Sequence, residues 1–369
     1  MKIDYTNSIV NLTHSLYKHY GLTPWHPTLS VVDDALAQGY NHVAVVLLDG
    51  LGNNLLKLHT DATPFFNETK VSEITSVFPS TTAAATTAVL TGKTPYESGY
   101  LGWFQYFKDE DIYYTIFKNE DYYDKEKFIP EGFFDTHFKQ STFIDRINEE
   151  TKVHAKHFFP ADIVGKEGYK TFDEGLKQLQ KFQRQHDQTL AYVYSVEPDQ
   201  NQHSHGLLHQ STKDVLSSLN ASMKALKATL SKDTLVIVTA DHGLSDVEPI
   251  PLFDYHDITA TFEHLPANEP RMTSFFIKDA MREYFIEFFT QHFGDYFDLY
   301  TKEEFLTKKL LGRGEKSPLV DYCLGDFISV AKDKYFFKLT DDKTHHAHHA
   351  GITNDEIIVP LMMFAGSEE

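Results

Sequence analysis

The sequence predicts an α/β fold in which helices cover both faces of a mainly parallel central sheet, with a small inserted subdomain. Three short, continuous apolar runs have the composition of parallel strands that are buried on both faces. They are residues 42–48, 190–196 and 234–239. Stretches with apolar residues at helical spacing separate these runs, and such alternation of strands and helices is typical of parallel sheets.

The helices and a fourth strand follow from the same periodicity. We expect a helix over residues 30–37, before the first strand, and a second helix over the small residues 83–90. Residues 169–185 and 212–230 carry apolar side chains at helical spacing, so a longer helix should precede each of the later two strands. Residues 274–277 form a shorter apolar run and are a weaker candidate for a fourth strand.

Two regions depart from this alternation. Residues 100–123 are dense in aromatic side chains, which either pack in a core or lid or stack on an aromatic group of a ligand. Residues 278–338 are rich in Phe and Lys, and we interpret them as an inserted, cap-like subdomain. The main domain would then consist of residues 1–277 together with 339–369.

Composition excludes several classes of function. Lys and Arg number 34 against 53 Asp and Glu, a formal net charge of −19, which disfavours a nucleic-acid polymer as partner. An anionic substrate would need local positive charge, which bound metal cations can supply. Cys323 is the only cysteine, so neither a disulfide framework nor a thiolate metal cluster is expected. With no apolar signal core and no apolar run of ~18 residues, we expect a cytoplasmic protein without a membrane partner.

Three aspartates follow the three predicted strands. Ligands of open α/β sheets bind beyond the carboxyl ends of the strands, and Asp49, Asp199 and Asp241 stand at or just after those ends. A single such aspartate is more often a helix cap, but three converging carboxylates repel one another unless cations neutralise them. His203 and His242 accompany two of them, and a mixture of Asp and His suits Zn or Mn.

A threonine and a histidine cluster extend this set. Thr82 precedes small residues that suit a helix start, where backbone N–H groups favour anions, although a plain capping role explains a lone threonine equally well. A hydroxyl bound to a metal can lose its proton near neutral pH. The late cluster of His345, His346, His348 and His349 is either a surface loop or the source of one further ligand.

These motifs, in this order, resemble the alkaline phosphatase superfamily, and most closely its type I phosphodiesterase and nucleotide pyrophosphatase branch. The resemblance spans about residues 43–360. The matching motifs are Leu47-Leu48-Asp49-Gly50, Phe78-Pro79-Ser80-Thr81-Thr82, Thr91-Gly92 with Pro95 and Gly99, Glu197-Pro198-Asp199 with His203 and Gly206, Asp241-His242-Gly243, and His349-Ala350-Gly351.

The resemblance implies an alkaline phosphatase-like core with two divalent metal ions, Zn first and Mn as the alternative. It assigns Asp199, His203 and His349 to the first metal ion, and Asp49, Thr82, Asp241 and His242 to the second. His348 is the fallback for His349. The implied substrate is a small phosphate ester such as a nucleotide.

The resemblance also implies a two-step reaction. The Thr82 oxygen would attack phosphorus, and water would then hydrolyse the phosphothreonine, with the Ala83 backbone N–H holding a phosphoryl oxygen. The branch usually places an asparagine after the nucleophile motif to contact that oxygen. Trp103 stands at that position here, so the contact is either missing or supplied by another residue.

Four functions remain open at this stage. The leading one is a phosphodiesterase or nucleotide pyrophosphatase. A phosphomonoesterase or phosphonate hydrolase would use the same scaffold, and a phosphotransferase or mutase would return the phosphoryl group to an alcohol. A catalytically silent, metal-stabilised binding protein is the fourth.

Overall fold

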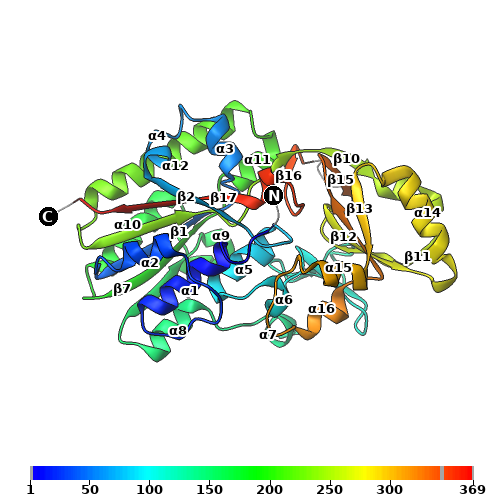
Figure 1. Cartoon of the computed structure of the whole chain (residues 1–369), viewed down its shortest axis with the longest axis horizontal. Helices are drawn as coiled ribbons and strands as arrows, with labels where there is room; N and C mark the ends of the chain where they lie inside the picture. Colours follow the sequence, from blue (N-terminus) through cyan, green and yellow to red (C-terminus); the bar gives the residue numbers. More distant parts are fainter. Residues whose placement is uncertain (1–2, 341–344, 368–369) are drawn as a thin grey trace.

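In the computed structural model, which describes residues 3–340 and 345–367, the chain forms two adjoining lobes, each built on its own sheet (Figure 1). The first sheet has six strands in the order β2-β17-β8-β1-β7-β6. Its centre is parallel and almost wholly buried, and it comprises β1 (His42–Leu48), β7 (Thr189–Ser195) and β8 (Thr234–Thr239). The more exposed edge strand β6 (His154–Phe158) pairs with β7, also in parallel. The three predicted strands and the mainly parallel α/β class are therefore confirmed.

Helices cover both faces of this sheet (Figure 1). One side carries α1 (Ile9–His19), α2 (Ser30–Leu36), α5 (Thr82–Thr91) and α8 (Phe143–Glu150). The other side carries α3 (Asn53–Leu58), α4 (Pro64–Thr69), α10 (Phe172–Gln183) and α12 (Gln210–Thr229). The four helices predicted from periodicity correspond to α2, α5, α10 and α12, with small differences at their ends.

Two strands at one side of the first sheet were not predicted. β17 (Ile358–Ala365) runs antiparallel to both β8 and β2 (Lys70–Thr75), between which it lies. Pro360 argues against a central strand, because proline cannot donate a ladder hydrogen bond. Here it is accommodated because β17 pairs with β8 only from Met362 onward.

The second lobe contains a seven-stranded antiparallel sheet in the order β13-β14-β12-β11-β3-β4-β5. Its strands are β3 (Phe104–Phe107), β4 (Ile112–Thr115), β5 (Glu120–Asp121), β11 (Phe262–Asn268), β12 (Met272–Ile277), β13 (Phe297–Thr301) and β14 (Phe327–Ala331). The predicted strand 274–277 is part of β12, so it belongs to this sheet and not to the parallel one. The helix α14 (Arg282–Phe293) packs on the sheet through Phe285, Phe289 and Phe293, which are buried.

Smaller elements join the two lobes. They are the strand pairs β10 (Glu248–Pro251) with β15 (Tyr335–Lys338) and β9 (Ser245–Asp246) with β16 (Ala347–His348), and the helices α6 (Pro95–Ser98), α11 (Asp199–His205), α15 (Lys302–Lys308), α16 (Pro318–Cys323) and α17 (Asn354–Ile357). The second sheet also draws strands from residues 104–121 and 262–277. Residues 278–338 are therefore one part of a larger lobe, and their assignment as a separate inserted subdomain remains a prediction.

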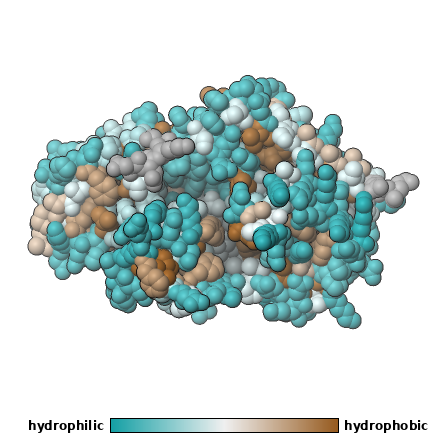
Figure 2. All heavy atoms as spheres, turned by 180° about the vertical axis from the view of Figure 1, so that it is seen from behind, coloured by the Kyte–Doolittle hydropathy of each residue, from teal (hydrophilic) through white to brown (hydrophobic). Residues whose placement is uncertain are grey.

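The surface of the protein is mostly polar on the face drawn in Figure 2. Figure 2 shows one face of the molecule, on which hydrophilic side chains predominate and apolar ones appear in separate small areas. Among the described helices, none combines the length and the apolar character needed to cross a membrane. Cys323 is buried, and burial raises the pKa of its thiol to about 12.

Candidate active site

A cavity of about 850 Å³ lies at the carboxyl ends of the central strands, where the two lobes meet. The first lobe contributes Asp49, Thr82 and Asp199 to its lining, and the second lobe contributes Trp103 and Glu269. The position beyond the strand ends is the one where open α/β sheets bind ligands.

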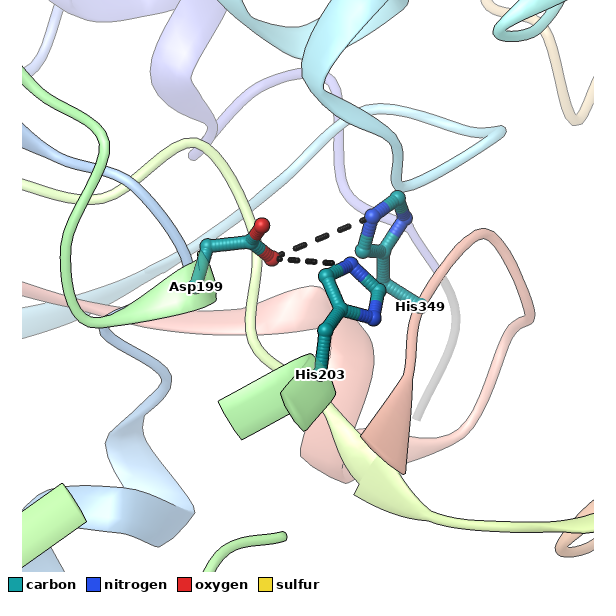
Figure 3. Close-up of side chains that lie close together, drawn as sticks. All are labelled: Asp199, His203 and His349. Atoms are coloured by element: carbon teal, nitrogen blue, oxygen red, sulfur yellow. Dashed lines mark ion pairs between the residues drawn. The ribbon is translucent and has the colours of Figure 1, made fainter. Parts of the chain in front are cut away.

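Asp199, His203 and His349 form one group of candidate metal ligands at this cavity. Asp199 and His203 are four residues apart on α11, so their side chains share one helix face, and His349 approaches from the late loop (Figure 3). Asp199 Oδ1 lies 3.4 Å from His203 Nε2 and 3.9 Å from His349 Nε2. His203 Nδ1 is hydrogen-bonded to the Ala347 carbonyl oxygen at 2.8 Å, which directs Nε2 toward Asp199.

Asp49, Asp241 and His242 form a second group, and all three are buried. His242 Nε2 lies 3.4 Å from Asp49 Oδ1 and 3.5 Å from Asp241 Oδ2. The Tyr194 hydroxyl donates to Asp49 Oδ2, and the Gly50 amide donates to Asp241 Oδ1 at 3.1 Å. Asp241 Oδ2 also accepts from Thr86 Oγ1 at 3.3 Å, whereas Asp49 Oδ1 faces the imidazole with no hydrogen-bond partner in the described part of the chain.

The two groups adjoin. The ring centroids of His242 and His349, which belong to different groups, are 4.0 Å apart. Gly50 permits this packing, because its φ is +71° and a Cβ there would lie 2.8 Å from Asp199 Cβ. The structure therefore brings together six predicted ligands that come from four separate segments of the chain.

Burial has the largest effect on the ionisation of both groups, and charge repulsion adds to it. Burial, followed by the charges of neighbouring carboxylates, raises the pKa values of Asp49 and Asp199 well above the usual range of aspartate. Burial lowers the pKa of His203 to about 3 and also lowers the pKa values of His242 and His349. The histidines are thus neutral, and they cannot compensate the carboxylates.

The donor set fits divalent metal ions. Asp49 Oδ1 and Asp199 Oδ1 are buried and have no hydrogen-bond partner within the described part of the chain. Each faces a neutral imidazole nitrogen at 3.4 Å. Unpaired buried carboxylate oxygens beside neutral imidazoles are costly without a cation, and Zn or Mn accepts this mixture of ligands.

Thr82 lies beside the second group. It is the first residue of α5, and its Oγ1 is 3.2 Å from His242 Nε2. Ala83 is the next residue, so its amide belongs to the first helical turn, where N–H groups lack intrahelical acceptors. The preceding turn is fixed to the late loop, because Ser80 Oγ donates to the Gly351 carbonyl oxygen at 2.8 Å.

Aromatic and basic side chains also line the cavity. Trp103 and Phe117 lie edge to face with their ring centroids 6.0 Å apart, and Lys118 Nζ lies 6.0 Å from the Trp103 ring. Lys139 and Lys338 also line the cavity. The region 100–123 therefore contributes both to a core and to the cavity wall.

Sequence reasoning missed Glu269, which is 1% exposed and lines the cavity. Its Oε1 accepts hydrogen bonds from Thr81 Oγ1 at 2.6 Å and from the Trp103 amide at 2.5 Å. No local sequence signal marks it, because it directly follows β11, whose partner β3 is far away in the sequence.

The remaining histidines of the late cluster surround the first group. His348 Nδ1 accepts a hydrogen bond from the His349 amide at 2.9 Å, and its ring lies beside Phe336. His345 lines the cavity with its ring centroid 4.5 Å from that of His203. His349, and not His348, is the residue of this loop within ligand distance of Asp199 and His203.

Comparisons with known proteins agree with this fold. The sequence model of the family described as type I phosphodiesterase / nucleotide pyrophosphatase matches residues 43–352. No curated protein sequence matches the chain. Among solved structures, murine ectonucleotide pyrophosphatase/phosphodiesterase 5, in an inactive form in complex with AMP, superposes with a TM-score of 0.66 at 17% identity over 87% of each chain. The human protein of the same name gives a TM-score of 0.63 at 14% identity, also over 87% of each chain.

Proposed function

Since the chain belongs to the type I phosphodiesterase/nucleotide pyrophosphatase family of the alkaline phosphatase superfamily, and is thus a metal-dependent hydrolase, we propose that it cleaves phosphate esters through a phosphothreonine at Thr82. The observation that carries this proposal is the position of Thr82 Oγ1, 3.2 Å from His242 Nε2 and beside two adjoining groups of metal ligands. Thr82 thus presents a hydroxyl nucleophile beside the second group, which the first group adjoins.

Two divalent ions, held by the two groups, would supply Lewis acidity and lower the pKa of a hydroxyl beside them. Thr82 would release its proton to solvent and form a bond to phosphorus while the bond to the leaving oxygen breaks. Water would then form a bond to phosphorus as the bond to Thr82 breaks. The Ala83 amide, in the first turn of α5, would donate a hydrogen bond to a phosphoryl oxygen during both steps.

The cavity supports a nucleotide-type substrate, a diester or a pyrophosphate that carries an aromatic group. Trp103 and Phe117 offer ring faces and edges for stacking, and Lys118 adds a cation near them. Lys139 and Lys338 would meet further anionic groups of the substrate. We place Zn²⁺ ahead of Mn²⁺, because each group combines carboxylate oxygen with imidazole nitrogen.

Hydrolysis of bis(p-nitrophenyl) phosphate by the Zn- or Mn-loaded protein tests this function. Thr82→Ala should reduce kcat by about 10³-fold or more, because removal of the nucleophile removes the covalent route. Thr290→Ala, at an exposed threonine of α14 that does not line the cavity, is the control and should keep the activity. Equal activity of Thr82→Ala and the unchanged protein would reject Thr82 as the nucleophile.

The same assay separates the related alternatives. A ratio of kcat/KM that favours p-nitrophenyl phosphate over the diester would indicate a phosphomonoesterase. Formation of a new ester with an added alcohol, in preference to release of phosphate, would indicate a phosphotransferase.

A further inference from the structure

We propose that the Glu269 carboxyl group, in its neutral form, donates the hydrogen bond to the phosphoryl oxygen for which related enzymes use an asparagine at the position of Trp103. The inference rests on the proposed function and adds a residue that contacts the phosphoryl group. It is carried by the packing of Glu269 between Thr81 and Trp103 at the cavity wall.

Strand pairing places Glu269 opposite Trp103, the residue at the position where related enzymes have the asparagine. β11 and β3 are antiparallel, with Asn268 paired to Phe104, so the next pair outward is Glu269 opposite Trp103. The backbones approach closely, since a Cβ on Gly102 would lie 2.7 Å from the Asn268 carbonyl oxygen. The Trp103 amide therefore reaches Glu269 Oε1 directly, at 2.5 Å.

A second contact places the same carboxyl group next to the nucleophile. Thr81 Oγ1 donates to Glu269 Oε1 at 2.6 Å, and Thr81 is the residue before Thr82. Glu269 and Thr82 both line the cavity. A phosphoryl group attacked by Thr82 would thus lie within reach of Glu269.

The hydrogen bonds leave only one oxygen for this role. Oε1 already accepts hydrogen bonds from two donors. Oε2 has no hydrogen-bond partner within the described residues, and the protein does not enclose it fully. A proton on the carboxyl group would therefore reside on Oε2, from which it can point into the cavity. In that state the group is a donor, as an asparagine amide would be.

The surroundings favour the neutral acid. Burial raises the pKa of Glu269 to about 8, against the opposing effect of the hydrogen bonds from Thr81 and Trp103. Within the described residues Glu269 forms no ion pair, and the nearby Arg271 is occupied by Glu356 and by the Tyr335 carbonyl oxygen. Lys118, one of the lysines that line the cavity, lies 6.0 Å from the Trp103 ring. An anionic phosphoryl group beside Glu269 would favour protonation further.

Three variants separate this role from a purely structural one. Glu269→Gln keeps the size and a donor but cannot ionise, whereas Glu269→Leu keeps the volume and loses the donor. Glu263→Gln removes the same charge from an exposed position of the same strand and serves as the matched control. Each is measured as the Zn-loaded full chain, with a thermal unfolding curve to establish that it folds.

The first readout is the pH profile of kcat/KM for bis(p-nitrophenyl) phosphate. The unchanged protein and Glu263→Gln should lose about tenfold per pH unit above about pH 8, because ionised Glu269 repels the substrate and no longer donates. Glu269→Gln should lack this alkaline decline. Glu269→Leu should lose about 10²-fold at pH 7, comparable to the loss of one oxyanion donor.

The second readout is the calorimetric Kd of the same diester in a Thr82→Ala background, where no turnover interferes. Affinity should fall above about pH 8 with Glu269 present and stay level with Gln. An identical pH dependence in both, or tighter binding by the Gln variant at pH 7, overturns the inference. If Thr82→Ala stays active but the pH dependence of binding still follows Glu269, the assigned nucleophile is wrong and Glu269 retains its role.

Discussion

Two of the candidate ligands are oriented by a hydrogen bond with a residue that is not itself a ligand. His203 is aligned by the Ala347 carbonyl oxygen, and Asp49 by the Tyr194 hydroxyl. Such bonds fix the ring or carboxylate before any metal ion binds, which reduces the ordering cost of binding. A single side-chain substitution should therefore change metal retention without reorganising the rest of the site.

The late histidine loop allows a direct test at one position. His349→Ala should lose about one of two bound metal ions after dialysis, because it removes a ligand of the group with Asp199 and His203. His348→Ala, whose ring lies beside Phe336, should retain both ions. Metal content is measured by mass spectrometry of the intact folded protein. Loss of metal from His348→Ala alone would reverse the assignment.

The raised pKa values of Asp49 and Asp199 predict how metal changes stability with pH. In the metal-free protein these groups bind protons more tightly when folded, so their stabilisation is complete below about pH 4 and is lost as the pH rises toward neutrality. Metal needs the ionised carboxylates, so its affinity rises over the same range.

The difference in Tm between Zn-loaded and chelator-treated protein should accordingly widen between about pH 5 and pH 8. Thermal unfolding with and without a chelator across this range measures it. A difference that narrows as the pH rises would show that the two carboxylates do not bind the metal.

At the residue scale, the sequence pointed to the side chains that lie together as candidate ligands, but not to the residues that orient them. Asp49, Asp199 and Asp241 follow apolar strands, and this pattern is local and visible. Glu269 and Tyr194 act through contacts with residues far away in the chain, and no local pattern reports such contacts.

At the scale of elements, one buried ion pair joins the second lobe to the late loop. Arg271 and Glu356 are both 0% exposed, and the guanidinium donates from Nε at 2.6 Å and from Nη2 at 3.0 Å. Glu356 also accepts from the Gly351 amide at 2.8 Å and from Thr353 at the start of α17. The pair thereby holds the backbone that carries His349.

Arg271→Met should destabilise the fold by about 3–5 kcal/mol, because it leaves the Glu356 carboxylate buried without a counter-charge. Arg271→Met combined with Glu356→Gln should recover part of that loss, since the unpaired charge is gone. Urea unfolding of the metal-free protein measures both. An equal loss in the single and the double variant would mean that packing, and not charge, dominates this contact.

Whether the sequence could predict a strand depends on whether local residues or distant partners determine that strand. β1, β7 and β8 are predictable, because a strand buried on both faces must be apolar throughout. β17 contains a proline, β3 and β4 are short aromatic segments, and β5 has only two residues, so none of them carries a strand signal of its own. Their place is set by partners such as β11, which lies far from β3 in sequence.

At the scale of the whole molecule, the negative net charge of the protein repels the anionic substrate that we expect. The net charge is −19, yet Lys118, Lys139 and Lys338 line the cavity. The long-range field should slow the approach of anions, while the local lysines and metal ions favour them once they arrive.

Raising the ionic strength should therefore increase kcat/KM for an anionic substrate at first. The Debye length falls from about 30 Å at 0.01 M to about 8 Å at 0.15 M salt, which screens distant charges more than those in contact. A nucleoside triphosphate should respond more strongly than a monoanionic diester, and initial rates at low substrate concentration measure both. A steady decline from the lowest salt onward would show that local attraction controls the encounter.

The position of β17 affects how the protein is made. This strand, near residue 365, lies between β2 and β8, which come from much earlier in the chain. During translation β2 and β8 leave the ribosome well before β17. Their edges that face β17 therefore stay unpaired until synthesis has passed residue 365. Nascent chains of this protein should accordingly depend on chaperones late in their synthesis, when the edges of β2 and β8 still lack their partner strand.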